Sequence, residues 1–275
     1  GALYGLSSVL LKINREERPE YIAACFDRTE PTFRKEIFSD YKIHRPKTAD
    51  ELVAQIIESK KVFEAFGIRT LEAPGFEADD LIGTATEKFK NEPNLKIVIL
   101  TGDLDTLQLI DKGSISVKVF RKGITDTMIY NEAAVRERYG IPPASLPDYK
   151  GLIGDSSDNI PGVPGIGPKT AAELLEKYKS LEDFLEKGKD ERPYEKIMSA
   201  KDQMFLSKKL GTIRRDAPLE IKTLDEIRYD GIKKENVVPY FEKNGFSSLI
   251  KRLNGEGAQE KKSARKGRAQ SNTLF

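Results

Sequence analysis

Residues 95–105, which read LKIVILTGDLD, decide the fold class of this protein. The first part of this stretch, Leu95 to Leu100, is an apolar run interrupted only by Lys96, which is typical of a parallel strand that is buried on both faces. The run ends at a glycine followed by Asp103 and Asp105, and open α/β sheets place their functional residues at the carboxyl ends of strands. The stretch therefore predicts a sheet with an acidic site at one edge.

Strand-like and helix-like segments alternate on the N-terminal side of this run, as in α/β proteins. Residues 21–26 and 68–72 predict strands, and 79–89 has the apolar spacing of a helix. A further helix is predicted to begin at Thr48, where Thr48 and Glu51 read as a capping box, and to stop near Gly67. Its apolar side would carry the following residues: Leu52, Val53, Ile56, Ile57 and Phe63.

After about residue 140 the pattern changes to helical segments separated by proline and glycine turns. One helix is predicted from a single apolar stripe, and another over 193–213. The stripe consists of Ala171, Leu174, Leu175 and Tyr178. We expect an α/β fold with a mostly parallel central sheet flanked by helices, followed by a helical region.

The composition limits which kinds of functional site and which structural classes are possible. The 275 residues are 38% apolar and 33% charged with a net charge of +2, which fits one large or two small soluble domains. The only histidine is His44 and the only cysteine is Cys25, so neither a zinc site of the usual ligands nor an internal disulfide can form. No apolar run approaches the roughly 20 residues of a membrane span, and a cytoplasmic location is expected.

Acidic residues stand where strands of such a sheet end. Each alone could simply cap a helix or favour its dipole, but four separate clusters at strand ends indicate one cleft. So many like charges require cations, and carboxylates suit Mg²⁺ or Mn²⁺ in a two-metal phosphoryl displacement. The candidates are Asp27, Glu77, Asp79, Asp80, Asp103, Asp105, Asp155 and Asp158.

A glycine-rich turn follows the last aspartates, where residues 160–172 read IPGVPGIGPKTAA. Gly162, Gly165 and Gly167 permit close approach to backbone amides, and Lys169 and Thr170 add donors at a helix start, which suits a DNA phosphate backbone. Two alternatives remain: a nucleotide-binding P-loop, although a proline separates the glycine from the lysine, and a helix–turn–helix connection without a ligand.

A basic segment lies between Asp27 and Thr48. Basic residues, including Arg34, Lys42 and Arg45, are interleaved with aromatic ones such as Tyr41. This pattern suits single-stranded nucleic acid, because charge follows the backbone while rings stack on bases. A solvated amphipathic helix is the alternative interpretation.

Taken together, these segments resemble the 5′ nuclease family, which comprises the 5′→3′ exonuclease domain of bacterial DNA polymerase I and flap endonucleases. The match runs in order from about residue 1 to residue 253. The matching segments are Phe26-Asp27, Phe33-Arg34, Tyr41-Lys42 with Arg45, FEADD at 76–80, LTGDLD at 100–105 and GDSSDNIPGVPGIG at 154–167.

The resemblance implies a metal-dependent 5′→3′ exonuclease or flap endonuclease of replication and repair. Its substrates would be 5′ flaps, nicked duplexes and single-stranded 5′ ends. Lys42 and Arg45, with Arg34, match basic residues of a helical arch that contact the scissile phosphate. The glycine turn matches a helix–hairpin–helix that grips duplex DNA, often with K⁺. Two metal ions would be shared by the eight acidic residues, with Asp27, Glu77, Asp79, Asp80 and Asp103 nearer the first and Asp105, Asp155 and Asp158 nearer the second.

The resemblance also implies a division into segments. Residues 1–140 would form the nuclease core with its arch at 28–50, 141–253 the DNA-binding region with the helix–hairpin–helix at 154–178, and 254–275 a flexible basic tail or linker to a polymerase domain. Family members begin with a strand ending in Asp-Gly, which we expect to be missing here. Without that strand and its aspartate, a non-catalytic module that binds duplex DNA is the alternative. A phosphotransferase or NTPase is a third possibility.

Overall fold

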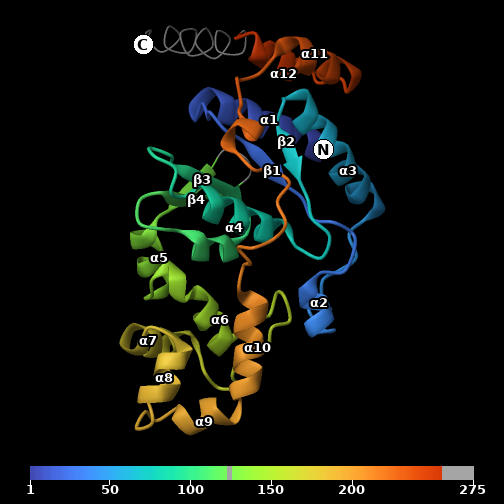
Figure 1. Ribbon diagram of the computed structural model, residues 1–275. Helices are drawn as coiled ribbons and strands as arrows, with labels where there is room; N and C mark the ends of the chain where they lie inside the picture. Colours follow the sequence, from blue (N-terminus) through green and yellow to red (C-terminus); the bar gives the residue numbers. More distant parts are fainter. Residues whose placement is uncertain (123–125, 256–275) are drawn as a thin grey trace, which may run out of the picture. The chain divides into compact units, whose positions relative to one another are not determined.

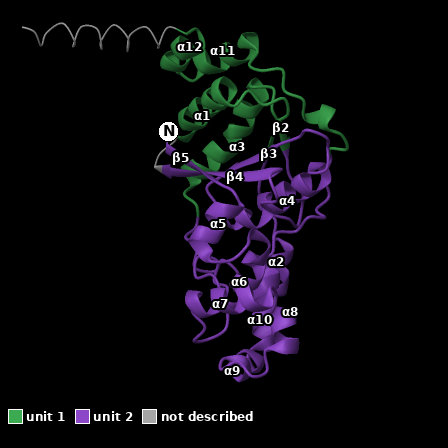
Figure 2. Ribbon diagram, turned by 90° about the vertical axis from the view of Figure 1, so that its left-hand side faces the viewer, with its two compact units in different colours: residues 1–24, 48–70, 221–275 green, residues 25–47, 71–220 purple. Residues whose placement is uncertain are grey.

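The computed structural model describes residues 1–122 and 126–255 and divides into two compact units. One unit holds residues 1–24 and 48–70 with the described chain from 221 onwards, and the other holds residues 25–47 and 71–220 (Figure 2). The predicted tail at 254–275 lies almost wholly outside the described residues. No helix among those described is long and apolar enough to cross a membrane.

The first unit is helical and closes around its own apolar core. Val62, Phe241 and Leu249 are fully buried there, and the rings of Phe66 and Phe241 meet edge to face at 6.1 Å. Its helices are α1 (Ala2–Glu16), α3 (Asp50–Ala65), α11 (Lys234–Lys243) and α12 (Ser247–Leu253), with the 3-10 turn η3 (Leu224–Ile227).

Helix α3 differs from its prediction in two respects. It begins at Asp50 after an Ala49 cap that makes no side-chain hydrogen bond, so the predicted capping box was wrong. It does end before Gly67, which has φ of +71°. Its predicted apolar side is 37–64% exposed at Leu52, Val53, Ile56 and Ile57. The helix instead buries Val62 and partly buries Phe63.

The predicted strands at 21–26 and 68–72 are confirmed as β1 (Ala23–Cys25) and β2 (Arg69–Leu71). They form a two-stranded sheet, and the chain passes from one unit to the other within each strand.

The second unit contains a three-stranded sheet in the order β3-β4-β5. Strand β3 (Ile97–Thr101) runs parallel to β4 (Ile115–Lys122), with Ile99 opposite Val117. Strand β5 (Asp126–Tyr130) returns antiparallel to β4, a hairpin that the sequence analysis missed. The predicted parallel strand is confirmed, but its burial on both faces is not, because Val98 is 50% exposed.

Helices dominate the second unit beyond the sheet, as predicted (Figure 1). The stripe on α7 is buried at all four predicted positions. The helix expected over 193–213 is two helices that meet at Ala200. The elements are α2 (Phe33–Ile37), α4 (Ala78–Phe89), η1 (Leu104–Leu109), α5 (Glu132–Tyr139), η2 (Pro143–Ser145), α6 (Leu146–Ile153), α7 (Pro168–Tyr178), α8 (Leu181–Lys187), α9 (Tyr194–Ser199) and α10 (Lys201–Gly211).

Helix α6 and helix α10 lie side by side and carry much of this core (Figure 1). Leu152 and Met204 are fully buried, and a Cβ on Gly151 would come within 3.2 Å of the Met204 carbonyl. This packing holds the end of α6 in place, and the last aspartates follow directly from it.

Candidate metal centre

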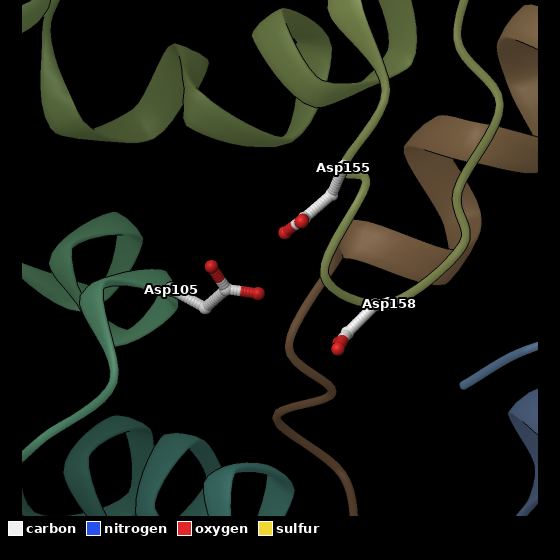
Figure 3. A group of neighbouring side chains, drawn as sticks. All are labelled: Asp105, Asp155 and Asp158. Atoms are coloured by element: carbon white, nitrogen blue, oxygen red, sulfur yellow. The ribbon is translucent and has the colours of Figure 1, made fainter. Parts of the chain in front are cut away.

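Three carboxylates of the second unit converge on one space (Figure 3). Asp105 lies at the start of η1, after β3, and Asp155 and Asp158 lie in the turn that follows α6. Each offers an oxygen, and these atoms all lie within 4.8 Å of one another. Oxygens around one Mg²⁺ at about 2.1 Å lie at most about 4.2 Å apart, so the group fits a hard divalent cation after a small adjustment.

Backbone contacts build the turn that carries two of these aspartates. Asp155 and Ile160 exchange two N–H···O bonds of 2.8 Å. Gly154 (φ +73°) and Gly162 (φ +65°) cross so closely that a Cβ on Gly162 would meet the Gly154 nitrogen at 2.3 Å. Gly162 is itself buried and its N–H donates to Ser207 Oγ at 3.1 Å. The DNA contact predicted for Gly162 is therefore not supported, because its role is to close this turn.

Lys150 joins two of the three carboxylates, a contact that the sequence analysis missed. Its Nζ donates to Asp105 Oδ1 and, at 2.7 Å, to Asp155 Oδ2. Burial raises the pKa of Asp155, but hydrogen bonds from Lys150 and Ser157 offset this and lower it to about 2. The pKa of Asp105 is raised, first by burial and then by the charges of Asp103 and Asp155. Lys150 lowers this pKa but does not cancel the rise. The only sequence signal for Lys150 is its position one turn before the Gly-Asp pair.

A second acidic group lies around Asp79 at the start of α4. Its pKa is raised to about 7, first by burial and then by Asp103, Asp105, Asp27 and Glu77. Asp27 Oδ1 accepts the N–H of Ala78 at 2.7 Å, which ties the end of β1 to this helix start. Asp103 Oδ1 accepts the N–H of Asp105 at 2.9 Å. The strand-end carboxylates therefore share one field, as the sequence predicts.

Asp80 points the other way and is fully buried. Its Oδ2 accepts from Arg34 Nη1 at 2.7 Å and from the Glu77 nitrogen at 3.0 Å. Its Oδ1 accepts from Arg34 Nη2 at 2.8 Å and from the Arg214 nitrogen at 2.9 Å. Both oxygens are thus occupied, so this arrangement does not support the metal role predicted for Asp80.

Arg34 is committed to the same buried contacts. Besides Asp80, its guanidinium donates to the carbonyls of Leu210 and Thr212, each at 2.9 Å. The pKa of Arg34 is lowered by burial but raised more by Asp80 and Glu77, so the guanidinium stays charged. The phosphate contact predicted for Arg34 is not supported, because the side chain anchors α2 to α4 and to the end of α10.

The segment around residues 41–45 lies over the carboxylates. Lys42 Nζ donates to Glu77 Oε1 at 2.9 Å, and Arg45 Nη2 donates to Asp158 Oδ1. The Tyr41 hydroxyl lies 3.2 Å from Glu77 Oε2 and 3.3 Å from Asp158 Oδ2. Because Tyr41 is buried, its ring is not available for the base stacking predicted from sequence. Lys42 and Arg45 do stand beside the acidic groups predicted to hold metal.

The other residues of the glycine turn that were predicted to contact DNA reach solvent. Gly165, Gly167 and Lys169 are exposed and Thr170 is half-buried, and the N-terminus of α7 has no side-chain cap. The Lys169 side chain is 92% exposed. Unlike Gly162, these residues are placed where a phosphate could reach them.

The fold and this geometry are those of a protein whose clustered carboxylates could hold a divalent cation. Comparison with known proteins identifies the family. The family described as 5′-3′ exonuclease, N-terminal resolvase-like domain, matches residues 1–140, and its C-terminal SAM fold matches residues 141–235. The chain belongs to the 5′-3′ exonuclease family. The resemblance and the α/β fold class are thereby confirmed, and so is a nuclease at the level of the family.

Proteins that are similar in sequence point to the same family. The chain is 44% identical over 259 residues to DNA polymerase I of Caldicellulosiruptor bescii, covering 92% of this chain and 30% of the relative. It is 40% identical over 264 residues to DNA polymerase I of Bacillus caldotenax, covering 95% and 30%. The chain therefore spans less than a third of the length of these relatives.

Solved structures share the fold. A bacteriophage T5 5′-exonuclease with bound zinc matches with a TM-score of 0.61 and 21% identity, covering 74% of this chain and 78% of that one. A bacteriophage T5 flap endonuclease solved with DNA and metal ions matches with a TM-score of 0.62 and 19% identity over the same shares, 74% and 78%.

Proposed function

We propose that this chain is a metal-dependent nuclease that hydrolyses DNA phosphodiesters at 5′ ends and 5′ flaps in replication and repair. One observation carries the proposal: Asp105, Asp155 and Asp158 converge within 4.8 Å, and Asp79 lies in the field of the neighbouring strand-end carboxylates. This gives two adjacent acidic groups in one unit. Two such groups suit a pair of divalent ions.

The groups would hold Mg²⁺ or Mn²⁺, since every candidate ligand is a carboxylate oxygen. Bound there, the two ions would activate water and offset the charge on the attacking and leaving oxygens of an in-line displacement. Asp105, Asp155 and Asp158 would hold one ion. Asp79, with Asp27, Glu77 and Asp103, would hold the other. Asp80 would act indirectly, because it fixes Arg34 and the start of α4.

Lys42 and Arg45 would bind the scissile phosphate. Both side chains already reach the carboxylates, with Lys42 on Glu77 and Arg45 on Asp158. Divalent cations on those carboxylates would weaken the two ion pairs and free the side chains for a phosphate. The site would thereby exchange internal ion pairs for contacts with metal and substrate.

The exposed N-terminus of α7 would hold the duplex by its backbone. Gly165, Gly167, Lys169 and Thr170 supply accessible amides and one charge, which suits phosphate contacts without base recognition. A K⁺ ion at this turn is part of the proposal. So is the division into a nuclease core at 1–140 and a DNA-binding region at 141–253. In a longer protein, a polymerase domain would follow the tail.

Cleavage of a labelled 5′-flap DNA tests the proposal. We expect short 5′ products in Mg²⁺ or Mn²⁺, none in EDTA, and a loss of roughly 100-fold or more in Asp155→Asn with flap binding retained. The assay is run on the 275-residue chain and on a chain extended by the first strand of the family. Binding without cleavage by both chains in both metals would contradict the proposal and favour a DNA-binding module.

A further inference from the structure

Lys150 is an unusual lysine because both of its acidic partners belong to the three-carboxylate group. It lies in the last turn of α6, and its side chain is only 15% exposed. Its Nζ contacts Asp105 and Asp155 but not Asp158. Asp158 is instead contacted by Arg45, by the Tyr41 hydroxyl and, at 3.9 Å, by Lys42 Nζ.

The ammonium therefore stands where a cation would stand. Asp105 and Asp155 point toward one another from η1 and from the turn after α6 (Figure 3). Without a positive charge between them, the two carboxylates would repel at this separation. Lys150 supplies that charge from within the chain.

We propose that Lys150 is a placeholder cation: it holds Asp105 and Asp155 together before metal binding and withdraws when a divalent ion binds them. The proposal rests on the proposed function only in that these carboxylates hold a metal. An ion bound to both aspartates would lie within a few Å of the ammonium, and two positive charges at that range repel strongly. Lys150 is thus a positioning residue that competes with the metal.

The surroundings give the side chain room to move. A cavity of about 350 Å³ opens beside it, with Tyr139, Tyr149 and Ser156 among its lining residues. The backbone of α6 is held against α10, so only the flexible lysine stem needs to change. The ammonium can leave the two carboxylates without disturbing the helix.

Lys208 on α10 offers a matched control. Its Nζ also bridges two carboxylates, Asp148 at 2.6 Å and Glu182 at 2.8 Å, and its side chain is similarly covered. Neither of these acids belongs to the metal-binding group. Removing the Lys208 charge should therefore affect folding without affecting metal affinity.

The test compares Lys150→Met, Lys150→Arg and Lys208→Met by Mn²⁺ titration, followed by electron paramagnetic resonance, and by melting with and without Mn²⁺. Lys150→Met should melt lower in EDTA, bind Mn²⁺ roughly tenfold more tightly than the unmodified chain, and gain more in melting temperature from Mn²⁺. Lys150→Arg, which keeps the charge, should stay within a few-fold of the unmodified chain. Lys208→Met should melt lower with unchanged Mn²⁺ affinity.

Unchanged or weaker Mn²⁺ binding by Lys150→Met would overturn the placeholder role. If Lys150→Met does not fold, Lys150→Gln provides the same comparison with a polar neutral side chain. Flap cleavage, measured in parallel, separates the two proposals. Tighter Mn²⁺ binding by Lys150→Met, without cleavage by any chain, would support the placeholder role and contradict the nuclease function. Cleavage with unchanged Mn²⁺ binding would support the nuclease function and contradict the placeholder role.

Discussion

Arg34 and Asp80 form a buried bidentate ion pair, with Nη1 to Oδ2 at 2.7 Å and Nη2 to Oδ1 at 2.8 Å. Their side chains are 3% and 0% exposed. The pair fixes α2, which precedes Lys42 and Arg45, against α4, which carries Asp79. The positions of Asp79 and of Lys42 and Arg45 are thus coupled through this buried ion pair.

Breaking this pair should be strongly destabilising. Arg34→Met would leave Asp80 as a buried charge without its partner, and we expect a loss of about 3–5 kcal/mol in the free energy of unfolding. Urea denaturation measures it. Arg28→Met, which breaks two ion pairs at the surface, with Glu30 and Glu72, is the control and should leave the midpoint unchanged within error. Equal effects of the two substitutions would refute a special role for the buried pair.

Gly162→Ala should unfold the turn that carries Asp155 and Asp158. The new Cβ would stand 2.3 Å from the Gly154 nitrogen, which is backbone and cannot move aside easily. We expect a loss of several kcal/mol in stability together with weaker Mn²⁺ binding. Thermal melting and Mn²⁺ titration check both.

Gly165→Ala is the control for that substitution. Gly165 also has a positive φ of +74°, but its Cβ would meet only the flexible end of Lys196. A loss of about 1–2 kcal/mol is expected from the backbone conformation alone. If Gly165→Ala proves as damaging as Gly162→Ala, the close backbone crossing is not the cause.

Metal binding should release protons near pH 6. Burial and neighbouring carboxylates raise the pKa of Asp79 to about 7, above the value of about 3.9 in an unfolded chain. Between these values the folded, metal-free protein holds a proton that the unfolded chain has lost, so its stability falls as pH rises from about 4 to about 7. A bound cation favours the ionised form and should expel that proton.

Calorimetric titration with Mg²⁺ in two buffers of different ionisation heat measures the released protons. Asp79→Asn should reduce the number released at pH 6 and flatten the decline in metal-free stability. Asp216→Asn is a control, since Asp216 has a lowered pKa and pairs with Arg214 at the surface. Release that is the same in Asp79→Asn as in the unmodified chain would show that another group carries the proton.

Lys169→Ala should weaken binding to all duplex sequences alike. A lysine that contacts phosphate contributes through released counterions, so the slope of log K against log salt should fall by about 1. Fluorescence anisotropy at several salt concentrations measures it. Lys177→Ala lies at the other end of α7, where Lys177 pairs with Glu191, and should keep the slope. A reduced slope in both variants would indicate a general charge effect instead of a site.

Several features followed from local sequence. The apolar run before Asp103 predicts β3, and the spacing of apolar residues predicts α4 and the buried face of α7. These patterns can be recognised in the sequence because the side chains of helices and strands repeat with periods of 3.6 and 2 residues. The sequence also predicted that the site is acidic, because the aspartates follow predicted strands and the carboxyl ends of parallel strands meet at one edge of a sheet.

Tertiary structure decided which of the candidate side chains face one another. Asp79 and Asp80 are neighbours in sequence, yet one faces the carboxylates and the other faces Arg34, because adjacent residues on a helix point about 100° apart. Lys150 carries no motif, and its bridge depends on how the end of α6 packs beside η1. The sequence by itself determined the kinds of group in the site, whereas packing of distant segments determined the direction of each.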